Sequence, residues 1–411
     1  MSANPIRAYI AVTAAYWSFM LTDGALRMLV LLHFNQLGFS PIQLAYLFLL
    51  YELAGIVTNL TAGWIAARFG LNTTLYAGLG LQVVALLALT LLSPDWLVAT
   101  SVAFVMCVQA CAGVAKDLTK MSAKSAVKIL APTTGGELFR WVALLTGSKN
   151  AVKGLGFFLG AAGLALLGFD VSLIVMAVGL VAVIIALALF MPAGLPSGKT
   201  SAKFTQIFAR SRDVNWLSAA RVFLFGGRDV WFVVGIPIYF TAVLSDGTAE
   251  SARQAFYLIG GFMALWIILY GAMQASAPKF INASQSLDEM KYSARNWVGV
   301  LFVIPCALSL AAFFIPAGMV LTLILVIGLL VFGAVFALNS SLHSYLILAF
   351  SKKRDVTMDV GFYYMANAAG RLMGTLLSGL SYQIGGLVLT LFIAAVMIAA
   401  SWLCANLLAQ N

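Results

Sequence analysis

Twelve long runs of apolar residues, separated by short polar segments, make up most of the chain. The runs lie at about 8–34, 41–66, 73–92, 95–116, 139–167, 171–191, 214–243, 254–277, 296–315, 317–346, 358–382 and 385–408. A helix needs about 20 apolar residues to cross the hydrocarbon core of a bilayer, and each run reaches that length. The pattern therefore predicts an all-α polytopic membrane protein with 12 transmembrane helices.

The longest polar stretch between runs follows the sixth run, at 192–213. We expect it to be a cytoplasmic linker between two six-helix halves, 1–191 and 214–411. A weak internal repeat agrees with this division. Shifting the sequence by 206 residues aligns Asp23 with Asp229, and a shift of 217 aligns Asn150 with Asn367. Parallel six-helix halves are the organisation of the major facilitator superfamily, so we expect that fold.

A short motif between the second and third runs supports the same fold. Residues 63–70 (GWIAARFG) resemble the superfamily's loop signature, in which glycines flank an acidic and a basic residue. Gly63, Ile65, Arg68 and Gly70 match the signature. Ala67 stands where the acid is usual, so this loop lacks the carboxylate on which the signature's charge-relay role depends.

Composition narrows the functional classes. Hydrophobic residues make up 62% of the 411 residues and charged residues only 9%, whereas soluble domains are about 45–50% apolar and about 25% charged. This excludes a water-soluble enzyme and a disordered chain. The sequence contains neither a His-Glu-x-x-His metal motif nor a Gly-x-Ser-x-Gly nucleophile motif, so we expect no enzyme activity, catalytic residue, metal site or cofactor.

The net charge of +10 is best explained by membrane topology. With the N-terminus in the cytoplasm, the inner segments hold nearly all the loop lysines and arginines, whereas the outer loops hold Arg253. The positive-inside rule therefore places both termini in the cytoplasm. The basic residues are assigned to loops of a membrane protein, so no nucleic-acid partner is expected.

Charged residues also lie deep within the predicted spans. The basic ones are Arg27, Lys149, Lys153, Arg221, Arg228 and Arg371, and the acidic ones are Asp23, Glu52 and Asp229. Charges at bilayer depth are costly and mark functional sites by default. Six cations against three anions leave a surplus of three positive charges. This surplus indicates that a non-protein anion binds among them. We therefore predict that the six cations, with Asn150 and Asn367, bind an anionic substrate.

Several pairings stay open at this stage. Asp23 and Arg27 are four residues apart, so an ion pair between them is an alternative to substrate binding. Arg228 and Asp229 are adjacent and should diverge on a helix. The three acids are candidates for proton coupling or for ion pairing, with Glu52 slightly preferred because its span carries no basic neighbour. The lysines 116, 120, 124 and 128 recur every four residues and are expected to form a solvated cytoplasmic stripe. Attraction of anions to the inner mouth is the lesser alternative for these lysines.

Five stretches resemble the ArsJ family of organoarsenical efflux permeases, within the major facilitator superfamily. They are 21–30 (LTDGALRMLV), 115–125 (AKDLTKMSAKS), 146–151 (TGSKNA), 153–154 (KG) and 220–232 (ARVFLFGGRDVWF). The resemblance implies export of 1-arseno-3-phosphoglycerate across the bacterial inner membrane. It also implies a functional partnership with a glyceraldehyde-3-phosphate dehydrogenase, which makes this ester when arsenate replaces phosphate, and resistance to arsenate as the outcome.

Two alternatives remain for cargo and energy source. The same cations would serve an exchanger or symporter for a phosphorylated or carboxylated organic anion. Export could be driven by proton antiport through an acidic residue or by breakdown of the labile ester outside the cell, and the sequence does not choose between them.

Overall fold

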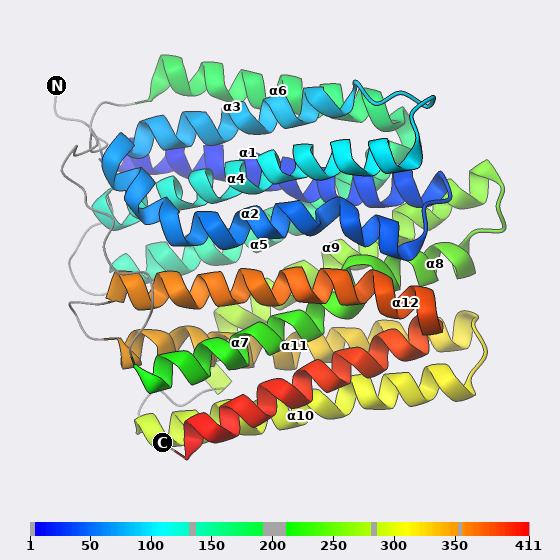
Figure 1. Cartoon of the computed structure of the whole chain (residues 1–411). Helices are drawn as coiled ribbons and strands as arrows, with labels where there is room; N and C mark the ends of the chain where they lie inside the picture. The colour runs from blue at the N-terminus through cyan, green and yellow to red at the C-terminus, as the bar shows by residue number, and fades with distance from the viewer. Residues whose placement is uncertain (1–4, 131–136, 192–210, 281–285, 352–355, 411) are drawn as a thin grey trace.

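The computed structural model describes residues 5–130, 137–191, 211–280, 286–351 and 356–410, which form one bundle of long helices (Figure 1). The elements are α1 (Pro5–Gln36), α2 (Pro41–Phe69), α3 (Leu71–Leu89), α4 (Val98–Leu130), α5 (Glu137–Leu167), α6 (Phe169–Phe190), α7 (Arg212–Val230), the π-helical turn η1 (Trp231–Gly235), α8 (Ile236–Leu244), α9 (Ala249–Phe280), α10 (Leu287–Phe314), α11 (Met319–Phe350) and α12 (Val356–Ala409).

The predicted all-helical fold is confirmed for the part of the chain that the structure describes. Among the described residues, ten helical stretches are long and apolar enough to cross a membrane. One of them, in α12, contains two helices that break at Gly385 and Gly386, where the backbone is non-helical. The ten stretches thus contain eleven spans, and the 32-residue α1 is not among them. Gly386 has a φ of 59°, a left-handed conformation that glycine adopts readily, and this permits the sharp turn between the last two spans.

The helices divide into two groups of six spans. α1 to α6 lie on one side of the bundle and α7 to α12 on the other (Figure 1). α5 packs on α9, and α2 packs on α12 and contacts η1, so these contacts join the two groups. This is the arrangement that the sequence predicts. Most of the predicted linker, residues 192–210, lies outside the described residues.

Glycines allow very close packing within each group. α1 packs on α5, and α7 packs on α12. A Cβ at Gly160 of α5 would lie 2.2 Å from the carbonyl oxygen of Ala25, and one at Gly370 of α12 would lie 2.1 Å from that of Val222. Small residues at such crossings bring backbones together in membranes, where packing rather than hydrophobicity drives helix association.

We therefore expect Gly160→Ala and Gly370→Ala to lower the free energy of unfolding by about 1–3 kcal/mol, because the added methyl must displace a neighbouring backbone. Gly179→Ala in α6 is the matched control, since a Cβ there has no neighbour within 4 Å. The measurement is thermal unfolding of the purified protein in detergent. Equal midpoints for all three variants would contradict the close packing.

The seventh span is continuous but changes its helical pitch near its middle. α7, η1 and α8 follow one another without a break from Arg212 to Leu244. Wider π-helical turns occur often at functional sites. The backbone N–H groups of Val234 and Gly235 donate to Ser378 Oγ at 3.1 and 3.2 Å, which ties the wide turn to α12. The turn directly follows Arg228 and Asp229, and Phe232 within it lines the central cavity.

Candidate substrate-binding site

A cavity of about 490 Å³ lies between the two groups of helices. This volume is within the usual range for small-molecule sites, about 300–1,000 Å³. All eight predicted substrate-binding residues line it: Arg27, Lys149, Asn150, Lys153, Arg221, Arg228, Asn367 and Arg371. Of the three predicted acids, Glu52 and Asp229 line it and Asp23 lies directly behind Lys153.

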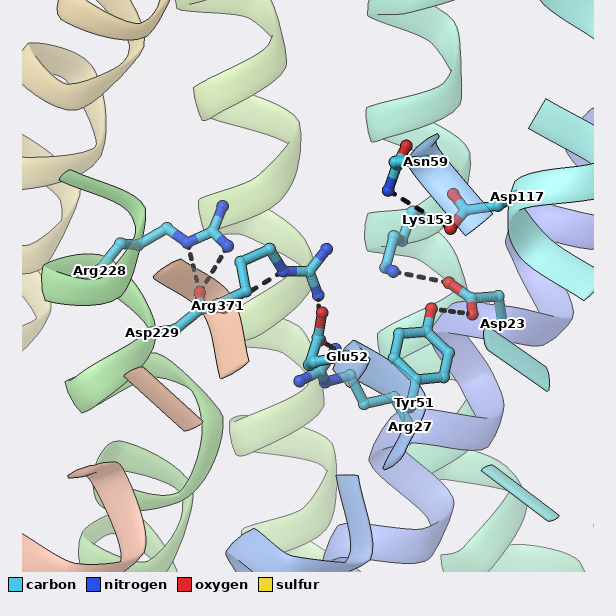
Figure 2. Close-up of polar contacts among 10 residues, drawn as sticks. All are labelled: Asp23, Arg27, Tyr51, Glu52, Asn59, Asp117, Lys153, Arg228, Asp229 and Arg371. Carbon is cyan, nitrogen blue, oxygen red and sulfur yellow. Dashed lines mark hydrogen bonds and ion pairs between the residues drawn. The ribbon is translucent and has the colours of Figure 1, made fainter. Parts of the chain in front are cut away.

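A chain of ion pairs crosses the centre of the bundle (Figure 2). Arg27 Nη1 lies 3.1 Å from Glu52 Oε1, and Arg371 Nη2 lies 2.6 Å from the same oxygen. Arg371 Nε reaches Asp229 Oδ2 at 3.3 Å, and Arg228 Nε donates to Asp229 Oδ1 at 2.6 Å. Glu52 comes from α2 and Arg371 from α12, so this chain links the two groups of six spans.

The structure corrects one sequence-based expectation about this chain of ion pairs and adds partners to a second residue. Arg228 and Asp229 were expected to diverge, but the long arginine side chain turns back and contacts the adjacent carboxylate. The sequence slightly favours Glu52 for proton coupling because this residue has no basic neighbour on its own span. In the structure, arginines from two other spans contact it, and its side chain is only 1% exposed. Its proposed coupling role is untested.

A second cluster joins α1, α2 and α5. Lys153 Nζ lies 2.6 Å from Asp23 Oδ2, and the hydroxyl of Tyr51 donates to Asp23 Oδ1 at 2.5 Å (Figure 2). The suggested pair between Asp23 and Arg27 is therefore wrong, since Arg27 pairs with Glu52 instead. Residues four apart on one helix share a face, but Asp23 and Arg27 each form an ion pair with a different neighbouring helix. The spacing along the sequence does not reveal these contacts.

A third cluster was missed from the sequence. α4 continues to Leu130, beyond the predicted span end at residue 116. Lys116 and Lys120 therefore line the cavity, which corrects the expected solvated stripe, while the side chains of residues 124 and 128 lie outside the described ones. Lys120 Nζ contacts Asp117 Oδ1 at 2.6 Å and Asn59 Oδ1 at 2.8 Å. The signal in the sequence was the acid three residues before Lys120, a spacing that brings both to one helix face.

Asn367 contacts a residue of its own half, whereas Asn150 contacts a residue of the opposite half. Asn367 Oδ1 accepts from Arg221 Nε at 3.0 Å, and Ser340 Oγ accepts from Arg221 Nη1 at 3.1 Å. Asn150 Nδ2 of α5 donates to Gln274 Oε1 of α9 at 3.2 Å, across the two groups of helices. The two asparagines that the internal repeat aligns thus occupy the same cavity.

The cavity carries a strong positive surplus. Eight basic residues line it: Arg27, Lys116, Lys120, Lys149, Lys153, Arg221, Arg228 and Arg371. Three acids line it, and Asp23 behind Lys153 makes four. Among the described residues the surplus is thus 8 − 4 = 4 positive charges. An excess of positive charge along the walls of a cavity attracts anions.

No protein-family model and no curated protein matches the sequence. Solved transporters share the fold. A protein from work on substrate recognition in proton dependent oligopeptide transporters matches with a TM-score of 0.70 and 13% identity, over 98% of this chain and 97% of that chain. A POT family transporter in complex with thioalcohol conjugated peptide gives 0.71 and 14%, over 96% and 94%. One in complex with 5-aminolevulinic acid gives 0.70 and 14%, over the same shares.

The POT family belongs to the major facilitator superfamily, so the chain has that superfamily's fold, as the sequence predicts. At identities of 13–14%, these structures show likeness in fold alone. The resemblance to the ArsJ family, and with it the arsenical cargo, stays a prediction.

Proposed function

We propose that this protein is a secondary transporter that moves an organic anion across the membrane by alternating access. The observation that carries the proposal is the central cavity with its surplus of four positive charges. A zwitterion such as a peptide would need cations and anions in balance. The surplus favours a cargo with more than one negative charge, because arginine and lysine bind phosphate-like and carboxylate groups.

The proposed cargo is 1-arseno-3-phosphoglycerate, with a glyceraldehyde-3-phosphate dehydrogenase as its source. Each of the five stretches that resemble the ArsJ family contributes to the cavity: Arg27, Lys116, Lys149, Lys153 and Arg221 are examples, one from each stretch. The alternative cargo is another phosphorylated or carboxylated organic anion, which the same cations would bind.

The proposed mechanism uses the contacts between the halves 1–191 and 214–411. Glu52 and Arg371 pair at 2.6 Å across the halves, next to the predicted binding residues. An anionic cargo competes with the Glu52 carboxylate for Arg371, so binding weakens this contact and favours movement of the halves. Proton uptake by an acid released in this way is one proposed source of coupling, and breakdown of the exported ester is the other.

The proposed orientation places both termini in the cytoplasm of a bacterium. The lining residues extend from the middle of the helices to Leu348, near the end of α11. α11 ends on the side of the bundle where α1 begins (Figure 1). In this orientation the cavity faces the cytoplasm, where the cargo is made.

Arsenate tolerance of an arsenic-sensitive bacterial strain tests the function. We expect the protein to confer resistance when it is expressed with a glyceraldehyde-3-phosphate dehydrogenase, and to confer none without it. Arg221→Ala should abolish resistance because Arg221 lines the cavity. Lys279→Ala, an exposed lysine at the end of α9, is the matched control and should keep resistance. Equal sensitivity of all well-expressed strains would remove the arsenical cargo and leave the alternative anions.

A further inference from the structure

Lys116 differs from the other cations of the cavity in its contacts. The carboxylates of Asp23, Glu52, Asp117 and Asp229 each touch a basic side chain. None of these contacts involves Lys116, which makes no ion pair with any residue that the structure describes. Three of the carboxylates lie within Coulombic range of Lys116, but the cation that touches each one already balances its charge.

The residues around Lys116 position its ammonium group but provide no hydrogen-bond acceptor for it among the described residues. Lys116 Nζ lies 4.1 Å from the centroid of the Tyr51 ring, a cation–π contact that fixes its position. An ammonium has three N–H donors, and an aromatic face replaces none of the oxygen acceptors they prefer. Lys116 is half-buried and lines the cavity, so its acceptors must come from the contents of the cavity.

Lys116 also lies where the two halves meet. A Cβ on Gly55 would be 3.8 Å from both Lys116 Nζ and Ala368 Cβ of α12. Asn367, the residue before Ala368, accepts a hydrogen bond from Arg221. Within the described part of the chain, Arg221 likewise contacts no carboxylate. Lys116 and Arg221 therefore border one cavity from opposite halves.

We propose that Lys116 is a further substrate-binding residue, which holds one anionic group of the cargo on the N-terminal half while Arg221 holds another on the C-terminal half. This inference rests on the proposed function as an anion transporter. It deepens that function by naming the class of cargo, an anion with two separated charged groups. Such a cargo bridges the halves, whereas a small anion with one charged group contacts only one of them.

Binding of 3-phosphoglycerate to the purified protein in detergent tests the inference, with glycerate as the probe that lacks the phosphate. Lys116→Met keeps the length of the side chain and removes its charge. We expect this variant to raise the Kd for 3-phosphoglycerate by about 10- to 100-fold, the effect of losing a charged hydrogen bond. The Kd for glycerate should change much less, so preference for the phosphorylated probe falls. The Kd of Lys116→Arg for 3-phosphoglycerate should stay within a few-fold of the wild-type value. Lys279→Met, the control, should have the wild-type Kd.

The possible outcomes separate the two proposals. An unchanged Kd in folded Lys116→Met and Lys116→Gln overturns the role of Lys116. Equal weakening for both probes, together with a lower unfolding midpoint, also overturns it, because that result indicates a structural role. If the wild-type protein binds neither probe, the proposed function itself fails, and this inference fails with it. Lys116→Gln provides the neutral variant if Lys116→Met does not fold.

Discussion

Lys153→Met is expected to lower the free energy of unfolding by about 3–5 kcal/mol, the usual cost of removing one partner from a buried ion pair. Lys153 Nζ lies 2.6 Å from Asp23, whose side chain is only 3% exposed. Without the ammonium, the carboxylate keeps the hydroxyl of Tyr51 as its contact and has no counter-ion touching it. Methionine keeps the aliphatic stem that packs near Gly24, so the loss comes from the charge. Thermal unfolding in detergent measures it.

The double variant Asp23→Asn with Lys153→Met is the control. It removes both charges, so no unbalanced carboxylate stays buried, and we expect it to recover most of the lost stability. A double variant no more stable than Lys153→Met would contradict the ion pair. Transport by the double variant then decides the role of Lys153. Recovery of transport means that Lys153 serves Asp23 alone, whereas continued loss means that it also contacts the cargo.

The fold could be predicted from the sequence because lipid imposes a simple requirement. Every backbone polar group must be satisfied within a span, so each long apolar run becomes a helix. The largest error was the end of α4. Lys116, Asp117 and Lys120 lowered the hydropathy there, although the helix continues to Leu130. A hydropathy profile places charged residues outside the membrane. It cannot show that these side chains enter a central cavity instead.

The members of the site were also predictable, but their partners were not. Depth along a span identified Arg27, Glu52 and Arg371, since charges at the middle of a membrane require a polar environment. Their contacts depend on which helices are neighbours and on how far long side chains reach. Arg371 contacts Glu52 of α2 and Asp229 of α7, two spans that lie far from it in sequence. No spacing rule along a single helix contains that information.

Arg371→Ala is expected to lower transport by about 100-fold or more. Arg371 contacts two buried carboxylates and links the two halves of the protein. Truncation of one partner in a buried, hydrogen-bonded charge pair costs about 2–5 kcal/mol, and each 1.4 kcal/mol corresponds to about tenfold. Arg371→Lys keeps the charge but loses the planar fork that reaches both acids, so we expect a smaller loss. Arsenate tolerance with the dehydrogenase is the readout, and exposed Arg253→Ala is the control.

The double variant Glu52→Gln with Arg371→Ala separates two explanations for this loss. If Arg371 only balances Glu52, removing both charges restores stability and transport together. If Arg371 also binds the anionic cargo, the double variant regains stability but stays inactive, because no neutral residue replaces the guanidinium. We expect the second result, since the cavity keeps a surplus of cations even after every acid in it has found a partner. Full transport by the double variant would show that Arg371 is a structural counter-ion. The cargo would then be expected to bind nearer to Arg221.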